Sequence, residues 1–218
     1  KEKRVIAQGG NMERGTLILK EGNKKIYTAI NDGNENQSCY IAETDDRVKL
    51  FVENVLLRML NIERVPNDYL KRNDQNSNLV IAVDIIPIEV YGWNYTTKEH
   101  LIYGVEEDEK LDELMLGFKM NEKLIGEDEV VKLGLLSDDE LKDIQKYAET
   151  VNDVVSDFFL NLGIELKWFK IRFGRELKDN NLLLVGFSLN DCNFSNITEA
   201  ELELELLTLL EDVLAEAI

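Results

Sequence analysis

The first part of the chain alternates between apolar and polar positions in a way that predicts strands. Thr16 to Tyr27 contains two β-prone runs around a Glu-Gly-Asn turn, which is typical of a hairpin, and Ser38 to Ala42 predicts a third short strand. From Asp46 the apolar spacing becomes helical and forms one stripe. We therefore expect a small sheet with one helix.

The longest apolar run lies just before the middle of the chain. Asn78 to Val90 is almost continuously apolar and β-branched, as expected for a central strand buried on both faces. Pro87 has no N–H to donate to a strand ladder, so we expect the strand to end or to meet a sheet edge there. This point is the expected crossing between two lobes, a small N-terminal lobe over 1–86 and a larger C-terminal lobe over 87–218.

The remaining part of the chain predicts helices and strands together. Ser137 and Glu140 form a capping box at the start of a long amphipathic helix that Gly163 ends. Ile164 to Phe173 and Leu182 to Phe187 are expected to form a strand pair. A last helix, Leu202 to Ile218, has leucines on more than one face, which indicates burial against the body or in a homodimer. The fold class is therefore α+β, with two lobes and a ligand cleft between them.

The charge of the chain excludes two classes of partner. Lys and Arg total 25 against 43 Asp and Glu, which gives a formal charge of -18. A phosphate backbone or an anionic membrane surface needs a field of the opposite sign, so neither nucleic acid nor membrane is expected. A solvated acidic surface is the ordinary interpretation of this charge, and a functional role such as mimicry of DNA is the alternative.

The few cysteines and the single histidine exclude several kinds of metal site and a disulfide framework. Cys39 and Cys192 have neither a disulfide framework nor zinc-ligand spacing, which indicates a cytoplasmic protein. His100 is the only histidine, so a two-histidine metal site cannot form, and we expect a solvated side chain there.

Several motifs, taken in order, resemble one enzyme family. Asp84-Ile85-Ile86-Pro87-Ile88-Glu89-Val90 with Asn94 is similar to the D-[IM]-[IV]-P-x-E-x-x-x-R-N stretch of the SAICAR synthetases. Their D-F-K-L-E-F-G-R motif is similar to the run from Phe169 to Arg175, and their I-S-P-D-T-C motif resembles Phe187 to Cys192. Order and spacing hold from about Asp46 to Cys192.

The resemblance implies a kinase-like small lobe whose Gly-containing hairpin covers nucleotide phosphates. In that family ATP activates a carboxylate of an aminoimidazole ribotide, and the amine of aspartate then attacks it. The expected nucleotide-binding residues are Gly22, Lys24, Lys25, Asp84 and Lys170.

The chain departs from the family pattern at charged positions. Trp93 stands where the resemblance implies a substrate arginine, and Glu99 stands where it implies a serine. Arg172 occupies the place of a magnesium-binding glutamate, and Val185-Gly186 that of a second acidic pair. Because arginine reverses the local charge, no metal site is expected, and nucleotide would bind without magnesium.

Three functions remain open. The first is a non-catalytic relative that binds a nucleotide, another phosphorylated small molecule or a protein partner. The second is an ATP-dependent ligase with an altered substrate, and the third is an acidic decoy or interaction protein. No catalytic residue is assigned, and the ligand-binding candidates are Glu89, Trp93, Asn94, Lys119, Arg172 and Ser188.

Overall fold

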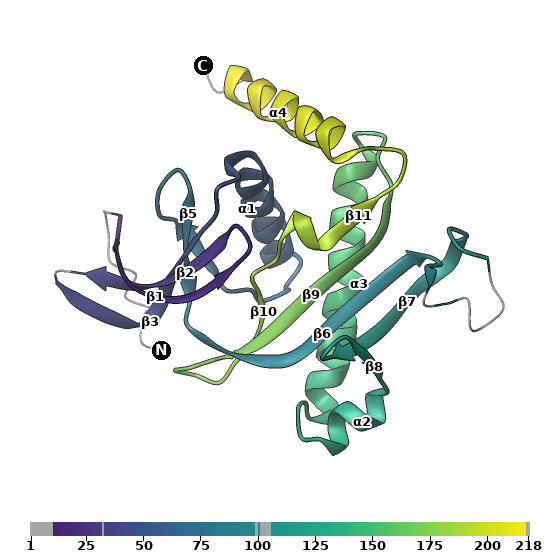
Figure 1. Ribbon diagram of the computed structural model, residues 1–218, viewed down its shortest axis with the longest axis horizontal. Coiled ribbons are helices and arrows are strands. Elements are labelled where there is room, and N and C mark those ends of the chain that lie inside the picture. The colour runs from purple at the N-terminus through teal and green to yellow at the C-terminus, as the bar shows by residue number, and fades with distance from the viewer. Residues whose placement is uncertain (1–10, 32, 99, 101–105, 217–218) are drawn as a thin grey trace.

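The computed structural model describes residues 11–31, 33–98, 100 and 106–216, and for 212–216 it describes the backbone alone. The molecule contains two antiparallel sheets. The smaller is formed toward the N-terminus, and the larger lies beside the helix α3 (Asp138–Leu160), as Figure 1 shows. This is the expected mixed α and β architecture.

The small sheet has five strands in the order β1-β2-β3-β5-β4. The predicted hairpin is formed by β1 (Glu13–Glu21) and β2 (Lys24–Asn31), and the predicted third strand is β3 (Asn34–Glu43). The two remaining strands are β4 (Tyr69–Arg72) and β5 (Ser77–Ile81). Its own apolar cluster is small, with Ala29, Cys39, Ile41 and Leu79 at its centre.

Helix α1 (Arg47–Ile62) joins the two sheets. It begins at Asp46, whose side chain accepts a hydrogen bond from the Lys49 backbone N at 2.9 Å. Its apolar stripe belongs to the main core, which also contains residues of α3 and of the large sheet. The helix therefore fixes the small sheet to the larger body.

The large sheet has the order β10-β9-β6-β7-β8, with β11 paired to β9. Its strands are β6 (Val83–Tyr95), β7 (Lys110–Met120), β8 (Lys123–Ile125), β9 (Leu166–Glu176), β10 (Leu182–Val185) and β11 (Cys192–Phe194). The predicted strand pair is confirmed, since β9 and β10 pair antiparallel. The strand β6 lies at the centre of the sheet between β9 and β7.

The prediction for the longest apolar run was wrong in part. The run is not one strand, because it is divided at Ala82, where the chain leaves the small sheet and enters β6. The strand β6 does not end at Pro87, but Pro87 pairs with neither neighbour: pairing with β7 begins at Glu89, and the register with β9 shifts between Ile85 and Glu89. The chain thus passes from the small sheet to the large sheet a few residues before the expected boundary at residue 86. The division into lobes 1–86 and 87–218 stays a prediction.

The long helix follows its prediction closely. Ser137 and Glu140 form the capping box at the start of α3, and Leu141, Ala148 and Val155 are all buried. Short helix α2 (Glu127–Lys132) precedes it. Helix α3 covers one face of the large sheet, so the opposite face of β6 and β9 is left for the site (Figure 1).

The last helix, α4 (Glu199–Glu216), lies across the top of the molecule (Figure 1). Thr198 and Glu201 cap it, and it packs on α1 with Leu202 and Leu206 buried. Leu204 and Leu207 are exposed, and the homodimer stays a prediction. Among the described residues, no helix combines the length and apolarity that crossing a membrane requires.

Candidate functional site

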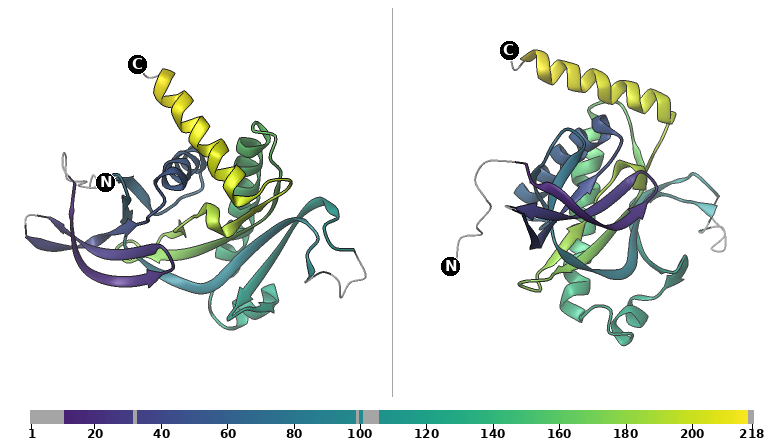
Figure 2. Two further views of the ribbon diagram at one scale, coloured as in Figure 1. Left: turned by 45° about the horizontal axis from the view of Figure 1, so that its top comes forward. Right: turned by 60° about the vertical axis from the view of Figure 1, so that its left-hand side comes forward.

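A cleft of about 490 Å³ lies between the β1–β2 hairpin, α1 and the outer face of the large sheet. Figure 2 shows the hairpin reaching from the small sheet toward β9 and β10. The cleft is therefore at the junction of the two sheets, where we expected a ligand.

One part of the cleft is apolar. Side chains from the hairpin and the neighbouring strands of the small sheet include Leu19, Ile26, Ala42 and Val80. Ile85 completes this wall, and it remains 45% exposed because the strand register shifts just after it. This apolar slot, lined by aliphatic side chains, suits an aromatic ring.

The tip of the hairpin contacts the opposite wall. The Nζ atom of Lys24 donates a hydrogen bond to the Gly186 carbonyl at 2.9 Å. Gly186 has φ +60, a conformation that strongly favours glycine, and a Cβ there would stand 3.4 Å from the Lys24 ammonium. Glycine at this position therefore allows the left-handed turn after β10.

Two cations lie on the floor of the cleft on β9, and carboxylates hold both. The Nζ atom of Lys170 is 3.1 Å from both Glu89 and Asp191. Arg172 is 3.2 Å from the Glu21 carboxylate, which comes from the end of β1, and 3.8 Å from Glu89. The hydrogen bond from Arg172 and its positive charge lower the pKa of Glu21. The ion pair with Arg172 thus joins the hairpin to the large sheet.

Two buried carboxyl groups complete the cleft. The Asp68 side chain accepts a hydrogen bond from the Gly186 N at 3.1 Å, and burial raises its pKa to about 6, although the charge of Lys24 opposes the shift. Glu53 on α1 accepts from the Leu189 N at 2.8 Å and from the Ser188 hydroxyl at 2.9 Å. Burial also raises the pKa of Glu53, again against the charge of Lys24.

Sequence reasoning missed Asp68 and Glu53. Glu53 carries a usable signal, because it lies one turn after Lys49 on the otherwise apolar side of α1, and both are buried. Lys49 reaches Asn190 at 2.8 Å and Glu199 at 3.2 Å. Asp68 has no comparable signal in its neighbouring residues.

Part of the predicted site comes together in the cleft. The cleft is lined by five of the predicted residues, Gly22, Lys24, Lys170, Arg172 and Ser188. Glu89 does not line the cleft itself, but it forms ion pairs with Lys170 and Arg172, which do.

Two predicted nucleotide-binding residues lie beside the cleft. The Nζ atom of Lys25 is 3.2 Å from Glu43, and its side chain does not line the cavity. Asp84 is exposed at the start of β6, opposite Arg175 on β9.

The other ligand-binding candidates lie farther along the large sheet. Trp93 is buried, stacks on Tyr91 with ring centroids 5.4 Å apart, and lies over Gly117, where a Cβ would come within 2.6 Å of the indole. The Nζ atom of Lys119 lies 4.2 Å from the Tyr91 ring centroid. Asn94 faces the helix side, where its amide donates to Asn152 at 2.7 Å.

The expectation of a solvated histidine was wrong. His100 is buried and meets Trp93 edge to face, with ring centroids 5.0 Å apart. Its Nδ1 accepts a hydrogen bond from the Thr97 backbone N at 2.8 Å. An aromatic cluster therefore fills this end of the sheet, while Glu99 lies outside the described residues.

Comparison with known proteins agrees with this architecture. The model of the SAICAR synthetase family matches residues 34–195. A phosphoribosylaminoimidazole-succinocarboxamide synthase of Streptococcus agalactiae is 29% identical over 148 residues, which are 65% of this chain and 63% of that relative. The match thus spans less than two thirds of that relative's length.

Solved structures show the same fold. The synthase of Ehrlichia chaffeensis superposes with a TM-score of 0.74 at 18% identity, covering 84% of this chain and 86% of that one. A type-2 SAICAR synthetase in complex with ADP gives a TM-score of 0.71 at 21% identity, with 82% and 83% covered. The motifs, the two-sheet fold and the family match agree, and the chain belongs to the SAICAR synthetase family.

Proposed function

We propose that the chain is a non-catalytic member of its family that binds an adenine nucleotide in the cleft between the two sheets. The aliphatic slot would take the base, and the hairpin tip with Lys24, Lys170 and Arg172 would face the phosphates. The ADP complex of a structurally similar protein supports this choice of ligand.

The observation that carries the non-catalytic part is the place of Arg172. Its guanidinium lies in the cleft between Glu21 and Glu89, where the family resemblance implies a magnesium carboxylate. Over the described ranges, no three His, Cys, Asp or Glu side chains stand close enough together to hold a metal ion. The donor set does not fit magnesium, because hard cations need several oxygen ligands free of a competing fixed cation.

The aromatic cluster supports the same proposal. Trp93, with Tyr91 and His100 around it, fills the end of the large sheet where the resemblance implies an arginine for an anionic substrate. A buried indole offers no charge to a carboxylate or phosphate group. A second, anionic substrate would therefore not find there the guanidinium that the resemblance implies.

An ATP-dependent ligase with an altered substrate is the second candidate. It is favoured by the carboxyl groups of Glu53, Asp68 and Asp191, which all line the cleft. These groups would have to leave their present hydrogen bonds and ion pairs to form a metal site.

Two measurements separate the candidates. Calorimetric titration with ATP, with and without magnesium, should show binding that magnesium does not strengthen. ADP release with ATP, aspartate and the carboxylated aminoimidazole ribotide should equal the rate without protein. Turnover that a chelator abolishes would establish the ligase, and absence of ATP binding would overturn the nucleotide proposal.

A pair of variants localises the binding. Arg172→Gln should weaken ATP binding, because it removes a cation from the cleft floor. Arg64→Gln carries the same charge change at an exposed residue outside the cleft and should leave the affinity unchanged. Equal affinities in the two variants would place the nucleotide elsewhere.

A further inference from the structure

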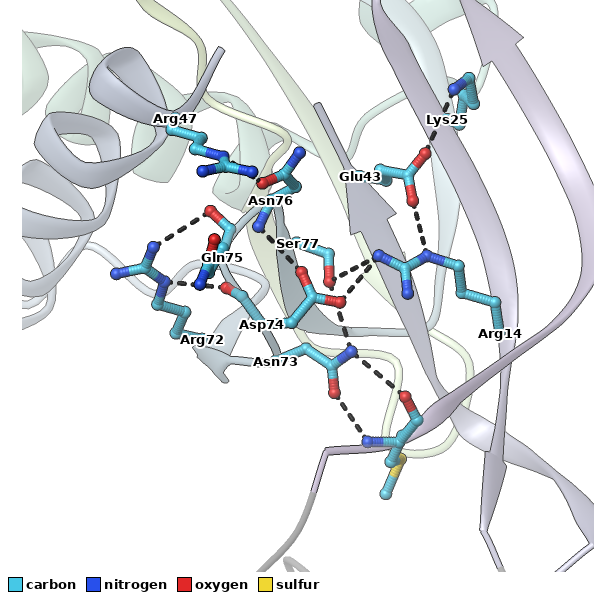
Figure 3. A network of polar contacts seen from close by, with 11 residues as sticks. Arg14, Lys25, Glu43, Arg47, Arg72, Asn73, Asp74, Gln75, Asn76 and Ser77 are labelled. Atoms are coloured by element: carbon cyan, nitrogen blue, oxygen red, sulfur yellow. Dashed lines mark hydrogen bonds and ion pairs between the residues drawn. The ribbon is translucent and has the colours of Figure 1, made fainter. Parts of the chain in front are cut away.

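A second depression lies on the small sheet, away from the apolar slot. It is an open groove of about 860 Å³, which we call the arginine groove, lined by Asn11, Arg14, Glu43, Arg47, Arg72, Asn73, Asp74, Gln75 and Asn76. Arg14 comes from β1, Arg47 from the start of α1 and Arg72 from the end of β4, so three separate elements bring guanidinium groups to one surface. Figure 3 shows them around the turn that joins β4 to β5.

The turn at the centre of the groove is held in place from below. Buried Asn73 donates to the Met12 carbonyl at 3.2 Å and to the Ser77 hydroxyl at 3.3 Å, and it accepts from the Met12 N at 2.8 Å. Asp74 accepts from the Asn76 N at 2.8 Å, which closes the turn on itself. The groove is therefore a preformed surface.

Two of the arginines use only neutral acceptors. The Nε of Arg47 donates to the Asn76 side-chain oxygen at 2.7 Å. Arg72 donates to the carbonyls of Asp74 and Gln75 at 2.8 and 3.0 Å. In the described part of the chain neither guanidinium has a carboxylate within ion-pair distance, so each keeps its charge and has nitrogens left to donate.

Arg14 differs from these two arginines. It pairs with Glu43 at 2.6 Å and with Asp74 at 2.8 Å, so its single positive charge offsets part of the negative charge of these two carboxylates. Glu43 also pairs with Lys25 at 3.2 Å. The carboxylates of the groove are thus occupied, and the charges of Arg47 and Arg72 determine what can bind.

We propose that the arginine groove binds a small oxyanion of the phosphate class, anchored by Arg47 and Arg72. Planar guanidinium groups bind such anions through paired charge-assisted hydrogen bonds, and here their contacts with the turn already orient them. The groove borders the cleft at Glu43, which lines both, but the proposal does not depend on the proposed nucleotide binding.

The charge of the chain favours a small ligand over a polymer. With a net charge of -18, a long polyanion crossing the surface would meet repulsion beyond the groove. A phosphate group experiences mainly the charges within about 8 Å at physiological ionic strength. A compact phosphate monoester therefore gains the attraction of the two arginines without that repulsion.

The test is a titration of the whole chain with inorganic phosphate, followed by amide and arginine Nε–H resonances at constant ionic strength in chloride. Gln75, Asn76 and the side chains of Arg47 and Arg72 should shift together and saturate. The double variant Arg47→Gln/Arg72→Gln should bind about tenfold more weakly or worse. The double variant Lys132→Gln/Lys142→Gln has the same charge change on exposed helix residues and should bind like the unaltered chain.

Thermal melts of every variant verify folding, and the single variant Arg47→Gln, which loses one side-chain contact, repeats the test if the double variant unfolds. An equal loss of phosphate affinity in both double variants would mean that only the total charge of the chain attracts phosphate, and would overturn the proposal. Shifts that never saturate in the unaltered chain would also overturn the proposal. Glycerol 3-phosphate should bind at least as well as a phosphoserine peptide, and the opposite order would contradict a small ligand.

Discussion

The cleft and the arginine groove both gather cations, but they hold them in opposite ways. In the cleft, Lys170 and Arg172 lie against carboxylates, at 3.1 Å and 3.2 Å. In the groove, Arg47 and Arg72 lie against amide and carbonyl oxygens. An anion entering the cleft must displace a carboxylate, whereas an anion entering the groove meets cations that are already oriented and not neutralised.

Burial separates the two regions as well. The cleft contains carboxyl groups that are almost completely removed from water, Glu53 and Asp68, whereas the carboxylates of the groove lie in direct ion pairs with Arg14. Burying a carboxylate raises its pKa unless a cation or donors compensate. The raised pKa values of Glu53 and Asp68 should make the fold lose stability as the pH rises. In the groove, hydrogen bonds from Asn76 and Arg14 lower the pKa of Asp74 against its partial burial, so its contribution should be lost as the pH falls.

The largest expected effect tests this difference at Asp68. Because burial raises its pKa to about 6, the folded state holds the Asp68 proton more tightly than the unfolded state does. The contribution of this group to stability is present below about pH 4 and is lost as the pH rises through about 6. The full loss is roughly 3 kcal/mol, from about two pKa units.

Asp68→Asn removes this titration while it can keep the hydrogen bond from the Gly186 N. Urea unfolding at pH 4.5 and pH 7.5 should show that the variant gains stability relative to the unaltered chain as the pH rises. Glu140→Gln, measured also at pH 3, is the opposite control, because the hydrogen bond from Arg175 lowers the pKa of Glu140 to about 2 and its contribution to stability is lost as the pH falls. If Asp68→Asn and the unaltered chain lose stability in parallel, Asp68 is not buried as described.

A smaller effect is expected when the cation of the cleft interior is removed. Lys24→Met should lower the free energy of unfolding by about 2 kcal/mol at pH 7.5, because the charge that opposes the raised pKa values of Glu53 and Asp68 is lost. The loss should shrink at pH 5, where both carboxyl groups bind protons more readily. Lys25→Met is the matched control at the adjacent residue, because Lys25 pairs with Glu43 and takes no part in the pKa shifts of Glu53 and Asp68. A similar loss there would contradict the role of Lys24.

Local patterns predicted the elements whose signals lie within a few residues. The helix α3 has its capping box and its apolar stripe within one stretch, and both were confirmed, although the helix ends at Leu160, before the predicted stop at Gly163. The strand through Pro87 was not predicted, because the register shift that accommodates the proline depends on its pairing with β9, far away in sequence. The residues next to Pro87 in the sequence do not indicate which distant strand will pair with β6.

The site divides in the same manner. Lys24, Lys170 and Arg172 lie in recognisable motifs, and the structure brings them to one cleft. Asp68 is one of 43 acidic residues, and its burial follows from the packing of β4, β5 and β10 around it rather than from its neighbours. His100 was expected in solvent because a lone histidine in a loop is usually solvated, and no local pattern shows that Trp93 packs against it.

The smallest expected effect concerns the carboxylate that an anion must displace from the cleft. Glu21 lies at the end of β1 and contacts Arg172 on β9 across the cavity, so it competes with nucleotide phosphates for the same guanidinium. Glu21→Gln should therefore strengthen ATP binding about two- to fivefold, the modest range expected for a partly exposed ion pair. The gain should fall as salt is raised, because added ions already weaken the pair in the unaltered chain. Glu35→Gln is the control, since Glu35 bonds to Thr28 outside the cleft and its substitution changes the net charge equally. A gain of the same size in both variants would reflect only the total charge of the chain, and weaker binding in Glu21→Gln would show that the carboxylate orients Arg172 for the ligand instead of competing with it.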